Sequence, residues 1–377
     1  MTGAHRRRLL FVLEYFPPHI GGVEVLFGAL AAELVRQGHE VEVITTAEAG
    51  EPRREVRDGV IIQRIATPRF ARRYLFMLMA LPRAIRAARR ADLVHTTTYN
   101  AAIPAWIAAR LARKPVVITV HEVFGRQWQE LPGMSPLLGW GYRLFESAVL
   151  RLGFAHLITP SDFTRRRLPD PSRGTTIHNA VDHELWSRER HQPRDLGLPP
   201  GTFVYLYFGR PGVSKGVEVL LAAAARIRRE LPASRLVMIL SREPTGQYRR
   251  LEPLLGALGE HLLLLDSVPR EELPSYVLAA DCVVVPSLSE GFGYSAIEAA
   301  ALGCRVIATT GHASEELLAG VATLVPPRNA DALASAILAL SRHAEPPPPL
   351  PRRFTPEAHA RAVLDVYRRV GGEGTPW

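Results

Sequence analysis

Two glutamates and the short segment between them are the residues of this chain best suited to bind a polar ligand. Glu290 and Glu298 enclose a glycine-rich turn that follows an apolar run and opens an alanine-rich helix. If that helix begins near Tyr294, Glu290 lies on the loop before it and Glu298 about one turn inside it. The free N–H groups and positive dipole end of the helix suit a phosphate, so the carboxylates would accept hydrogen bonds from hydroxyls. A ligand that carries phosphate between two hydroxyl-bearing ends is a nucleotide sugar.

A second loop supplies the positive charge that such a ligand requires. Arg210 and Lys215 follow the apolar run 204–208. An arginine fork and a lysine point charge together can neutralise a diphosphate without a metal ion. Lys215 is one of only two lysines in the chain, so composition explains its place poorly. The ordinary alternative for each of these charged residues is a solvated surface side chain beside a simple turn.

The first half of the chain offers two weaker candidates. Gly21 and Gly22 join the apolar run 9–13 to a helix, where a backbone without side chains can approach a ligand closely. His121 lies just past the apolar run 116–120. Both have ordinary explanations, as a strand-to-helix turn and as a hydrogen-bonded polar residue. Both nevertheless follow the carboxyl ends of predicted strands, where ligands bind to parallel sheets.

These residues need a scaffold, and the apolar runs indicate which one. The runs are continuous rather than alternating, and helical patterns separate them. Such runs are typical of parallel strands that helices cover on both faces. The chain is therefore predicted to form two Rossmann-like, doubly wound α/β domains in series. The predicted strands are residues 9–13, 40–45, 93–95, 116–120, 157–159, 204–208, 236–240, 262–265, 282–285 and 305–308.

Length and turn signals set the expected domain organisation. A chain of 377 residues is too long for one compact core. We expect a first domain over residues 1–190 and a second over 191–350, because residues 182–201 form a polar, turn-rich break. The last segment, 351–377, holds an amphipathic helix that is predicted to pack back on the first domain.

The sequence shows no sign of export or of metal binding. It has no apolar run of 18 or more residues, and its first residues lead straight into a strand pattern, so we expect a cytoplasmic protein. Cys282 and Cys304 lie in apolar surroundings without metal-ligand spacing. They are therefore predicted to be reduced, buried thiols.

The charge of the chain is asymmetric. The formal net charge is +9, and residues 1–190 hold 27 Lys and Arg against 18 Asp and Glu, so the first half carries the whole surplus. A basic half suits an anionic membrane, a nucleic acid or a phosphorylated acceptor. High-GC codon usage explains the same surplus, since every basic residue except Lys114 and Lys215 is an arginine. Both explanations stay open.

Together these motifs resemble the large retaining glycosyltransferase family with the GT-B fold, known as glycosyltransferase group 1 or family 4. The resemblance spans nearly the whole chain and depends on the order and spacing of motifs that are each weak alone. The matching landmarks are residues 21–24, His121, residues 161–164, Asn179 with Asp182, residues 209–210 with 215–216, Tyr276 with 279–281, and residues 290–293 with Glu298.

The resemblance implies a donor site and a reaction. A hexosyl-type sugar would move from a nucleotide diphosphate sugar to an acceptor hydroxyl with retention of configuration, by front-face attack, without a metal ion or other cofactor. The residues implied as catalytic are His121, Arg210, Lys215 and Glu290. Those implied as donor-binding are Gly21, Gly22, Arg210, Lys215, Val268, Glu290, Gly291, Phe292, Gly293 and Glu298, and those implied on the acceptor side are His121 and Tyr15.

Several positions depart from the family pattern. Residues 241–246 stand where the family has a glycine-rich turn beside the expected base pocket, so the nucleotide stays open. Gly311-His312 replaces the common Gly-Gly, and Glu122 follows His121 where aspartate is common. These changes concern specificity more than the reaction.

The acceptor stays open between a lipid-linked molecule and a secondary metabolite. Residues 69–90 combine arginine clusters with a compact apolar block, and residues 137–152 have the same character. Such a segment suits peripheral contact with the inner face of a membrane. A helix packed on the first sheet with arginines outward explains the same residues, and the shortness of the apolar block favours packing.

Two other classes of function stay open beside the transferase. One is a GT-B enzyme with another reaction, such as a nucleotide-sugar epimerase; a pyridoxal-dependent phosphorylase is disfavoured by the near-absence of lysine. The other is a basic, non-catalytic protein that binds a membrane surface or nucleic acid. The resemblance favours the transferase, for which no nucleic-acid partner is expected.

Overall fold

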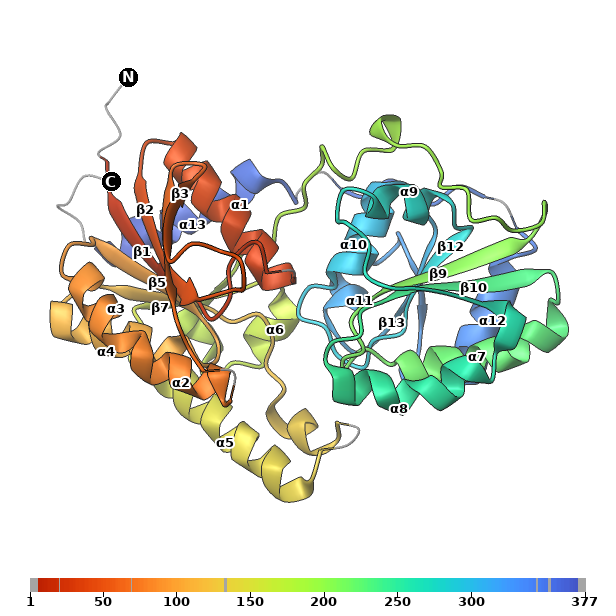
Figure 1. The fold of residues 1–377 in the computed structure, drawn as a ribbon, viewed down its shortest axis with the longest axis horizontal. Coiled ribbons are helices and arrows are strands. Elements are labelled where there is room, and N and C mark those ends of the chain that lie inside the picture. The colour runs from red at the N-terminus through yellow and green to blue at the C-terminus, as the bar shows by residue number, and fades with distance from the viewer. Residues whose placement is uncertain are drawn as a thin grey trace. The chain divides into compact units, whose positions relative to one another are not determined.

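The computed structural model describes residues 6–19, 21–68, 70–131, 134–343, 345–351 and 354–371 (Figure 1). The chain divides into two compact units, which are described separately. The first unit comprises Met1–Trp128, Pro136–Ala180 and Arg353–Trp377, and the second comprises Gln129–Ser135 and Val181–Arg352.

The division after Ala180 comes earlier in the chain than the border expected between residues 190 and 191. Its physical cause is Trp186, which is fully buried and stacks on Phe208 of the second unit with ring centroids 6.2 Å apart. Of the segments discussed above, Arg69 and residues 352–353 and 372–377 lie outside the described residues.

An eight-stranded sheet forms the centre of the first unit, in the order β3-β4-β2-β1-β5-β6-β7-β8. Its neighbouring strands are parallel except β3 and β4. The central strands are buried except for Arg8, and most of their side chains are apolar on both faces; the buried polar residues are 95–97 and Thr119. The strands are β1 (Arg8–Val12), β2 (Glu40–Thr46), β3 (Arg54–Arg57), β4 (Val60–Ile65), β5 (Leu93–Thr97), β6 (Val116–Thr119), β7 (His156–Thr159) and β8 (Gly174–Thr176).

Helices bury both faces of this sheet. One face packs against α1 (Gly22–Arg36) and the C-terminal helix α13 (Pro356–Gly371), whose Val363 and Tyr367 are fully buried. The other face packs against α3 (Leu81–Ala88), α4 (Ala102–Ala112) and the end of α5 (Pro136–Arg151), largely through alanines that let the helices approach closely. The unit also contains α2 (Arg72–Met79), α6 (Asp162–Arg166) and the 3-10 turns Gly125–Gln129 and Pro171–Arg173.

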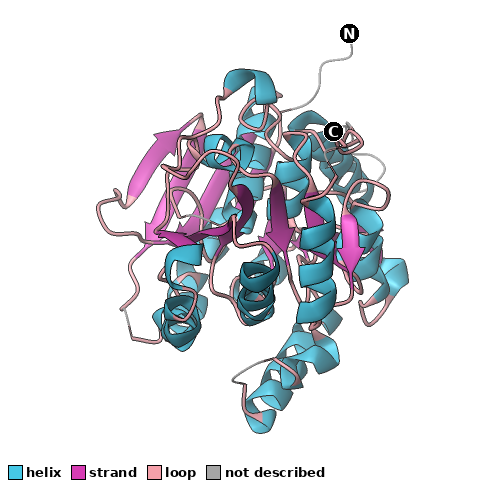
Figure 2. Cartoon of the chain, turned by 90° about the vertical axis from the view of Figure 1, so that its right-hand side faces the viewer, coloured by secondary structure: helices cyan, strands magenta, loops and turns pink. Residues whose placement is uncertain are grey.

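The second unit is a six-stranded parallel sheet in the order β11-β10-β9-β12-β13-β14. Its strands, drawn in magenta in Figure 2, run between cyan helices. The strands are β9 (Phe203–Gly209), β10 (Ser234–Leu240), β11 (Leu262–Leu265), β12 (Cys282–Val285), β13 (Val306–Thr309) and β14 (Thr323–Val325). The helices are α7 (Val217–Glu230), α8 (Thr245–Gly256), α9 (Leu273–Leu278), α10 (Tyr294–Ala301), α11 (Ala313–Leu317) and α12 (Ala330–Leu340), with 3-10 turns at Arg188–Arg190 and Gly259–His261.

Each sheet has one point where the strand order reverses. In the first unit the chain passes from β1 to β2 on one side and later returns to β5 on the other side. In the second unit the corresponding neighbours are β9 and β12. The loops after such a pair of strands diverge and leave a crevice at their carboxyl ends, which is the usual place for a ligand in this architecture.

The structure confirms the predicted fold class of two doubly wound, parallel-sheet α/β domains. Cys282 and Cys304 are free and buried, and burial raises their thiol pKa values to about 12 and about 11. Among the described residues, no helix is both long and apolar enough to span a membrane.

Candidate active site

A single glycine brings the two loops at the reversal point of the second unit together. Gly216 begins α7 with a φ of +64°, and a Cβ atom there would lie 2.0 Å from the carbonyl oxygen of Pro286. Only glycine fits, because the obstructing atom belongs to the backbone. The amide of Leu288 also donates to the carbonyl of Ser214 over 2.7 Å. The loop after β9 is thereby held against the loop after β12, and Lys215 faces the second loop.

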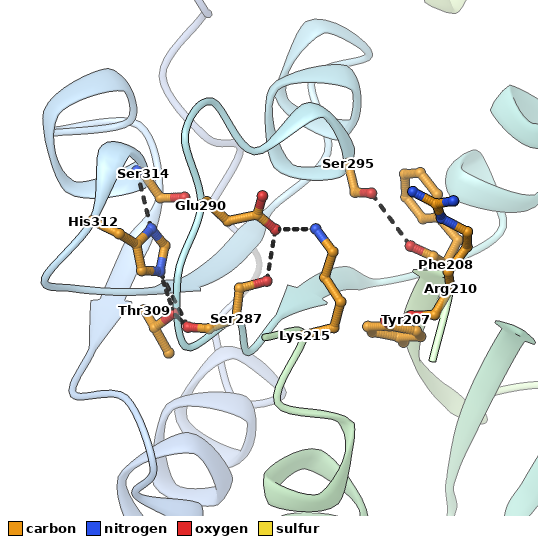
Figure 3. Close-up of polar contacts among 10 residues, drawn as sticks. All are labelled: Tyr207, Phe208, Arg210, Lys215, Ser287, Glu290, Ser295, Thr309, His312 and Ser314. Carbon is orange, nitrogen blue, oxygen red and sulfur yellow. Dashed lines mark hydrogen bonds and ion pairs between the residues drawn. The ribbon is translucent and has the colours of Figure 1, made fainter. Parts of the chain in front are cut away.

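Lys215 and Glu290 form an ion pair between these loops. The Nζ of Lys215 lies 2.7 Å from Oε1 of Glu290, and the hydroxyl of Ser287 donates to the same oxygen over 2.7 Å (Figure 3). Burial raises the pKa of Glu290, but the charge of Lys215 and these two hydrogen bonds outweigh it and leave the pKa below its ordinary value. Glu290 is therefore ionised at neutral pH, and its Oε2 has no hydrogen-bond partner among the described residues.

Arg210 lies at the start of the same loop as Lys215. Its carbonyl oxygen accepts a hydrogen bond of 3.0 Å from the hydroxyl of Tyr207, which fixes the backbone (Figure 3). The guanidinium is exposed, and within the described part of the chain it has no acidic partner. An arginine fork that no protein group occupies is well suited to an anionic ligand.

Helix α10 begins at Tyr294, as its sequence pattern predicts. Gly293 is the N-cap residue with a φ of +82°, a conformation that favours glycine. No side chain within the described residues caps this end of the helix. Gly291 and the buried Phe292 complete the turn that leads from Glu290 to the helix. The arrangement directs a helix N-terminus toward the same place as Lys215 and Glu290.

Glu298 lies one turn inside α10, and its partner is an arginine that sequence reasoning missed. Its side chain is 4% exposed, and its Oε1 accepts a hydrogen bond of 2.6 Å from Arg270. Burial raises the pKa of Glu298 above its ordinary value, although Arg270 opposes the shift. The guanidinium of Arg270 also lies over the ring of Trp186, 5.9 Å from its centroid. Val268, half-buried, precedes Arg270 by two residues on the loop after β11.

His121 belongs to the first unit, where it follows β6. Its ring packs edge-on against Phe27, and its Nε2 atom is buried without a hydrogen-bond partner among the described residues. Burial, with a smaller contribution from His359, lowers its pKa to about 4. The imidazole is therefore neutral near pH 7 and suits a hydrogen bond rather than an ion pair.

The turn after β1 holds the other candidates of the first unit. Tyr15 stacks on His19 with ring centroids 4.2 Å apart, and burial raises its pKa. Gly21 is the extended N-cap residue of α1, and Gly22 is its first residue. A Cβ atom on Gly21 would lie 2.3 Å from Oε2 of Glu24. A carboxylate therefore already lies at this helix end, which suits a hydroxyl-bearing ligand better than a phosphate.

The predicted site residues thus form two groups, each at the carboxyl edge of its own sheet. The structure brings Lys215, Glu290 and the start of α10 together, with Arg210 on the same loop as Lys215. The group of the second unit consists of Arg210, Lys215, Val268, Glu290, Gly291, Phe292, Gly293 and Glu298, and that of the first consists of Tyr15, Gly21, Gly22 and His121.

Two family models and several curated relatives match this chain. The model described as Glycosyltransferase Family 4 matches residues 20–185, and the model described as Glycosyl transferases group 1 matches residues 202–343. The D-inositol 3-phosphate glycosyltransferase of Thermobifida fusca is 31% identical over 316 residues, which are 76% of this chain and 72% of that protein. D-inositol 3-phosphate glycosyltransferase 1 of Catenulispora acidiphila is 30% identical over 315 residues, 76% of this chain and 74% of the relative. This chain belongs to the family 4, group 1 glycosyltransferases.

Solved structures show that this glycosyltransferase has the GT-B fold. Sucrose-phosphate synthase from Thermosynechococcus elongatus superposes with a TM-score of 0.79 at 24% identity, over 97% of this chain and 99% of that chain. Anabaena HepE in complex with UDP and glucose superposes with a TM-score of 0.73 at 19% identity, over 97% and 100% of the two chains. The expected family, fold and enzyme class are confirmed, and the transferase is favoured over the two other classes of function considered.

The glycosyltransferase site also contains residues that sequence reasoning did not single out. Ser287 and Arg270 hold the two glutamates, and Trp186 lies beside Arg270. Serine before an acidic loop and arginine within a polar loop are common in any sequence, so no signal marked them. The described residues contain no group of three or more His, Cys, Asp or Glu side chains placed to hold a metal ion.

Proposed function

We propose that this glycosyltransferase transfers a hexosyl-type sugar from a nucleoside diphosphate sugar to an acceptor hydroxyl, with retention of configuration and without a metal ion or other cofactor. The observation that supports this most is the pairing of Lys215 with Glu290 on the loops that also carry Arg210, whose guanidinium has no acidic partner among the described residues. Two cations, an ionised carboxylate and a helix N-terminus meet the needs of a diphosphate that is bonded to a sugar.

In this proposal the cations act on the leaving group. Arg210 and Lys215 neutralise the donor diphosphate and stabilise the negative charge that develops as the glycosidic bond breaks. Glu290 offers its unoccupied Oε2 to a hydroxyl of the transferred sugar, aided by the amides of Phe292 and Gly293. Glu298 accepts from the ribose hydroxyls once Arg270 shares or releases its carboxylate, and Val268 lies on the base side.

In this proposal the proton of the acceptor hydroxyl passes to a phosphate oxygen of the donor and not to a side chain. Glu290 is a poor general base because Lys215 and Ser287 lower its pKa. A phosphate oxygen of the departing nucleotide therefore accepts the proton of the acceptor hydroxyl while that hydroxyl attacks the same face of the sugar. His121, a neutral imidazole whose buried Nε2 has no hydrogen-bond partner among the described residues, is assigned to a sugar hydroxyl. Tyr15 is assigned to the acceptor side, and Gly21 and Gly22 to the donor.

A thermal-shift panel of UDP-, GDP-, ADP- and TDP-sugars tests the donor class. A bound donor at 100- to 1,000-fold excess over its dissociation constant should stabilise the protein by roughly 3 to 4 kcal/mol. UDP-glucose is the first candidate because Anabaena HepE has been solved with UDP-glucose at 18% identity. Lys215→Ala should abolish the shift and lower kcat by about 100- to 1,000-fold. Lys114→Ala, which removes the only other lysine, should leave both unchanged.

Three results would contradict this proposal. The first is a full thermal shift in Lys215→Ala, since the lysine would then not hold the diphosphate. The second is turnover that EDTA abolishes and Mg²⁺ restores. The third is inversion of the anomeric configuration in the product, read by NMR.

For the acceptor we propose a molecule held at an anionic membrane surface, with the enzyme in the cytoplasm at the inner face of that membrane. The helices α2 and α5 are joined by the hydroxyls of Tyr74 and Tyr142, 3.3 Å apart, and both expose large apolar side chains. Phe70 and Leu78 are exposed at α2, and Trp140 at α5. The positive surplus of residues 1–190 suits any polyanion, and the exposed apolar side chains favour anionic lipid over nucleic acid.

Cosedimentation with vesicles tests this surface. Vesicles of phosphatidylglycerol should bind the enzyme, vesicles of phosphatidylcholine should not, and Leu78→Glu with Trp140→Glu should release it. Leu254→Glu changes an exposed leucine of the second unit and is the matched control. Absence of binding, together with turnover of D-inositol 3-phosphate, the acceptor in the names of the relatives, would indicate a soluble acceptor instead.

A further inference from the structure

We propose that His312 is a positioning residue of the donor site, which fixes the carboxylate of Glu290 through Ser287. The proposal rests on the donor site proposed above and adds a residue to it that touches neither donor nor acceptor. His312 lies on the connection between β13 and α11, where it is 2% exposed.

The hydrogen bonds of His312 define its tautomer. Its Nδ1 accepts from the amide of Ser314 over 3.3 Å, so Nδ1 carries no proton. The proton is therefore on Nε2, which lies 3.1 Å from the carbonyl oxygen of Ser287 and 2.8 Å from Oγ1 of Thr309. A carbonyl oxygen can only accept, so the imidazole donates toward Ser287 (Figure 3). Burial lowers the pKa of His312 and keeps the ring in this neutral form.

From Ser287 the restraint passes to Glu290. The hydroxyl of Thr309 also donates to the carbonyl of Ser287, so two groups hold this peptide. The side chain of Ser287 donates to Oε1 of Glu290 over 2.7 Å, and the amide of Ala313 donates to the carbonyl of Glu290 over 3.1 Å. The loop from Ser287 to Glu290 is thus held at both ends by residues of the next connection. These contacts fix the position of Oε2 of Glu290 before a donor binds.

A purely structural role for His312 makes a different prediction. As N-cap of the short helix α11, the histidine would serve only to satisfy the amide of Ser314. Asparagine caps helices well, but its side chain is too short to reach both Ser314 and the carbonyl of Ser287. His312→Asn therefore keeps the cap and removes the link to Glu290. The link belongs to this chain in particular, because the family pattern has glycine at this position.

Calorimetric titration with UDP and with UDP-glucose tests the proposal, because only the second ligand carries the sugar that Glu290 would hold. We expect His312→Asn to weaken UDP-glucose binding about 10-fold, which is about 1.4 kcal/mol, and to leave UDP binding within about twofold. Ser287→Ala should give the same pattern, and the double variant should be no weaker than either single variant, because both changes break one path. Asn329→Gly removes a comparable cap from α12 and should alter neither affinity.

Three outcomes would overturn the role of His312: UDP-glucose binding at the wild-type level in His312→Asn, an equal loss for UDP and UDP-glucose, or additive effects of the two substitutions.

A second measurement needs no donor. The coupling between Lys215→Met and Glu290→Gln in urea unfolding should fall by half or more in the His312→Asn background, and an unchanged coupling contradicts the proposal. If the wild-type enzyme binds neither UDP nor UDP-glucose but the coupling still falls in the His312→Asn background, the proposed uridine donor is wrong and the role of His312 stands.

Discussion

At the scale of residues, two glutamates on either side of one turn acquire opposite properties from their partners. Both carboxylates are removed from water, which by itself raises a carboxyl pKa. At Glu290 the charge of Lys215 and the hydrogen bond from Ser287 outweigh burial, so its pKa is lowered. At Glu298 burial outweighs Arg270, so its pKa is raised. Glu290 is therefore a permanent acceptor, whereas the charge of Glu298 depends on Arg270.

Replacing Arg270 by alanine should destabilise the second unit by about 2 kcal/mol at pH 7.5, because a buried carboxylate loses its compensating cation. The loss should be smaller at pH 5. Without Arg270 the pKa of Glu298 rises further, and above the ordinary carboxyl pKa the unfolded chain releases a proton that the folded chain keeps. Stability therefore falls as the pH rises through this range, which urea unfolding at the two pH values measures.

Arg242→Ala is the matched control for this prediction. Arg242 pairs with Asp266 over 3.0 Å in the same unit, but both side chains are exposed. Its removal should change stability by less than about 0.5 kcal/mol at either pH. An equal loss for Arg270→Ala at pH 5 and pH 7.5 would show that Glu298 does not cause it.

At the scale of elements, the starts of α7 and α10 decide where the charged side chains lie. Each helix has an N-cap glycine in the left-handed region, at the end of the loop that follows the preceding strand. At Gly216 the backbone of the loop after β12 occupies the place of a side chain. The sequence pattern predicted the start of α10 near Tyr294, but the close approach of the two loops is a property of the folded chain.

Gly216→Ala should destabilise the protein by about 3 kcal/mol or more, because the left-handed backbone costs about 1 to 2 kcal/mol and the clash with the carbonyl of Pro286 adds to it. Gly303→Ala is the matched control: its φ is +70°, and a Cβ atom there meets nothing within 4 Å. It should cost only about 1 to 2 kcal/mol. Equal unfolding midpoints of the two variants would contradict the close approach of the loops.

The pattern of burial explains which elements could be predicted. Each predicted strand, such as 204–208 for β9 (Phe203–Gly209), has a counterpart because a strand covered on both faces is continuously apolar. The sequence pattern did not identify β3, because this edge strand carries polar residues such as those of Arg54–Arg57. It also did not identify β4, which lies inside the sheet but alternates buried with half-buried residues and includes Gln63 and Arg64, so its apolar run is not continuous. The strands β8 and β14 have three residues each, too few for a pattern.

At the scale of the whole molecule, the chain returns to its first unit at the end. The hydroxyl of Tyr367 on α13 lies 2.6 Å from Nδ1 of the buried His95. His359, on the same helix, lies 2.8 Å through its Nδ1 from the carbonyl of His178. Burial lowers the pKa of His95 to about 3 and those of His121 and His359 to about 4. The last helix thus adds His359 to the neutral histidines His95 and His121 of the first unit.

These histidines should make the enzyme sensitive to mild acid. In the unfolded chain each has a pKa near 6.5, so below that pH unfolding takes up protons that the folded chain excludes. The contribution of these histidines to the free energy of unfolding is full above about pH 7. It falls as the pH drops toward 4, by about 1.4 kcal/mol per pH unit for each histidine. Urea unfolding between pH 7.5 and 5 measures this slope.

His359→Gln should reduce the slope by about one proton, while the exposed His343→Gln should not change it. The comparison concerns the slope and not the midpoint, because loss of the hydrogen bond to His178 lowers the stability of the glutamine variant at every pH. A slope that His359→Gln leaves unchanged would show that His359 is protonated in the folded enzyme.

The sequence alone determined the two doubly wound sheets, the loops that carry Arg210 and Lys215, and the turn from Glu290 into α10. Local propensity and the periodicity of apolar residues specify these features, and both are properties of neighbouring residues. Three features became visible only in the folded chain: Lys215 and Ser287 share one oxygen of Glu290, Arg270 pairs with Glu298, and His312 reaches Ser287. Such contacts join separate loops of a sheet, and their partners follow from strand order and packing rather than from distance along the chain.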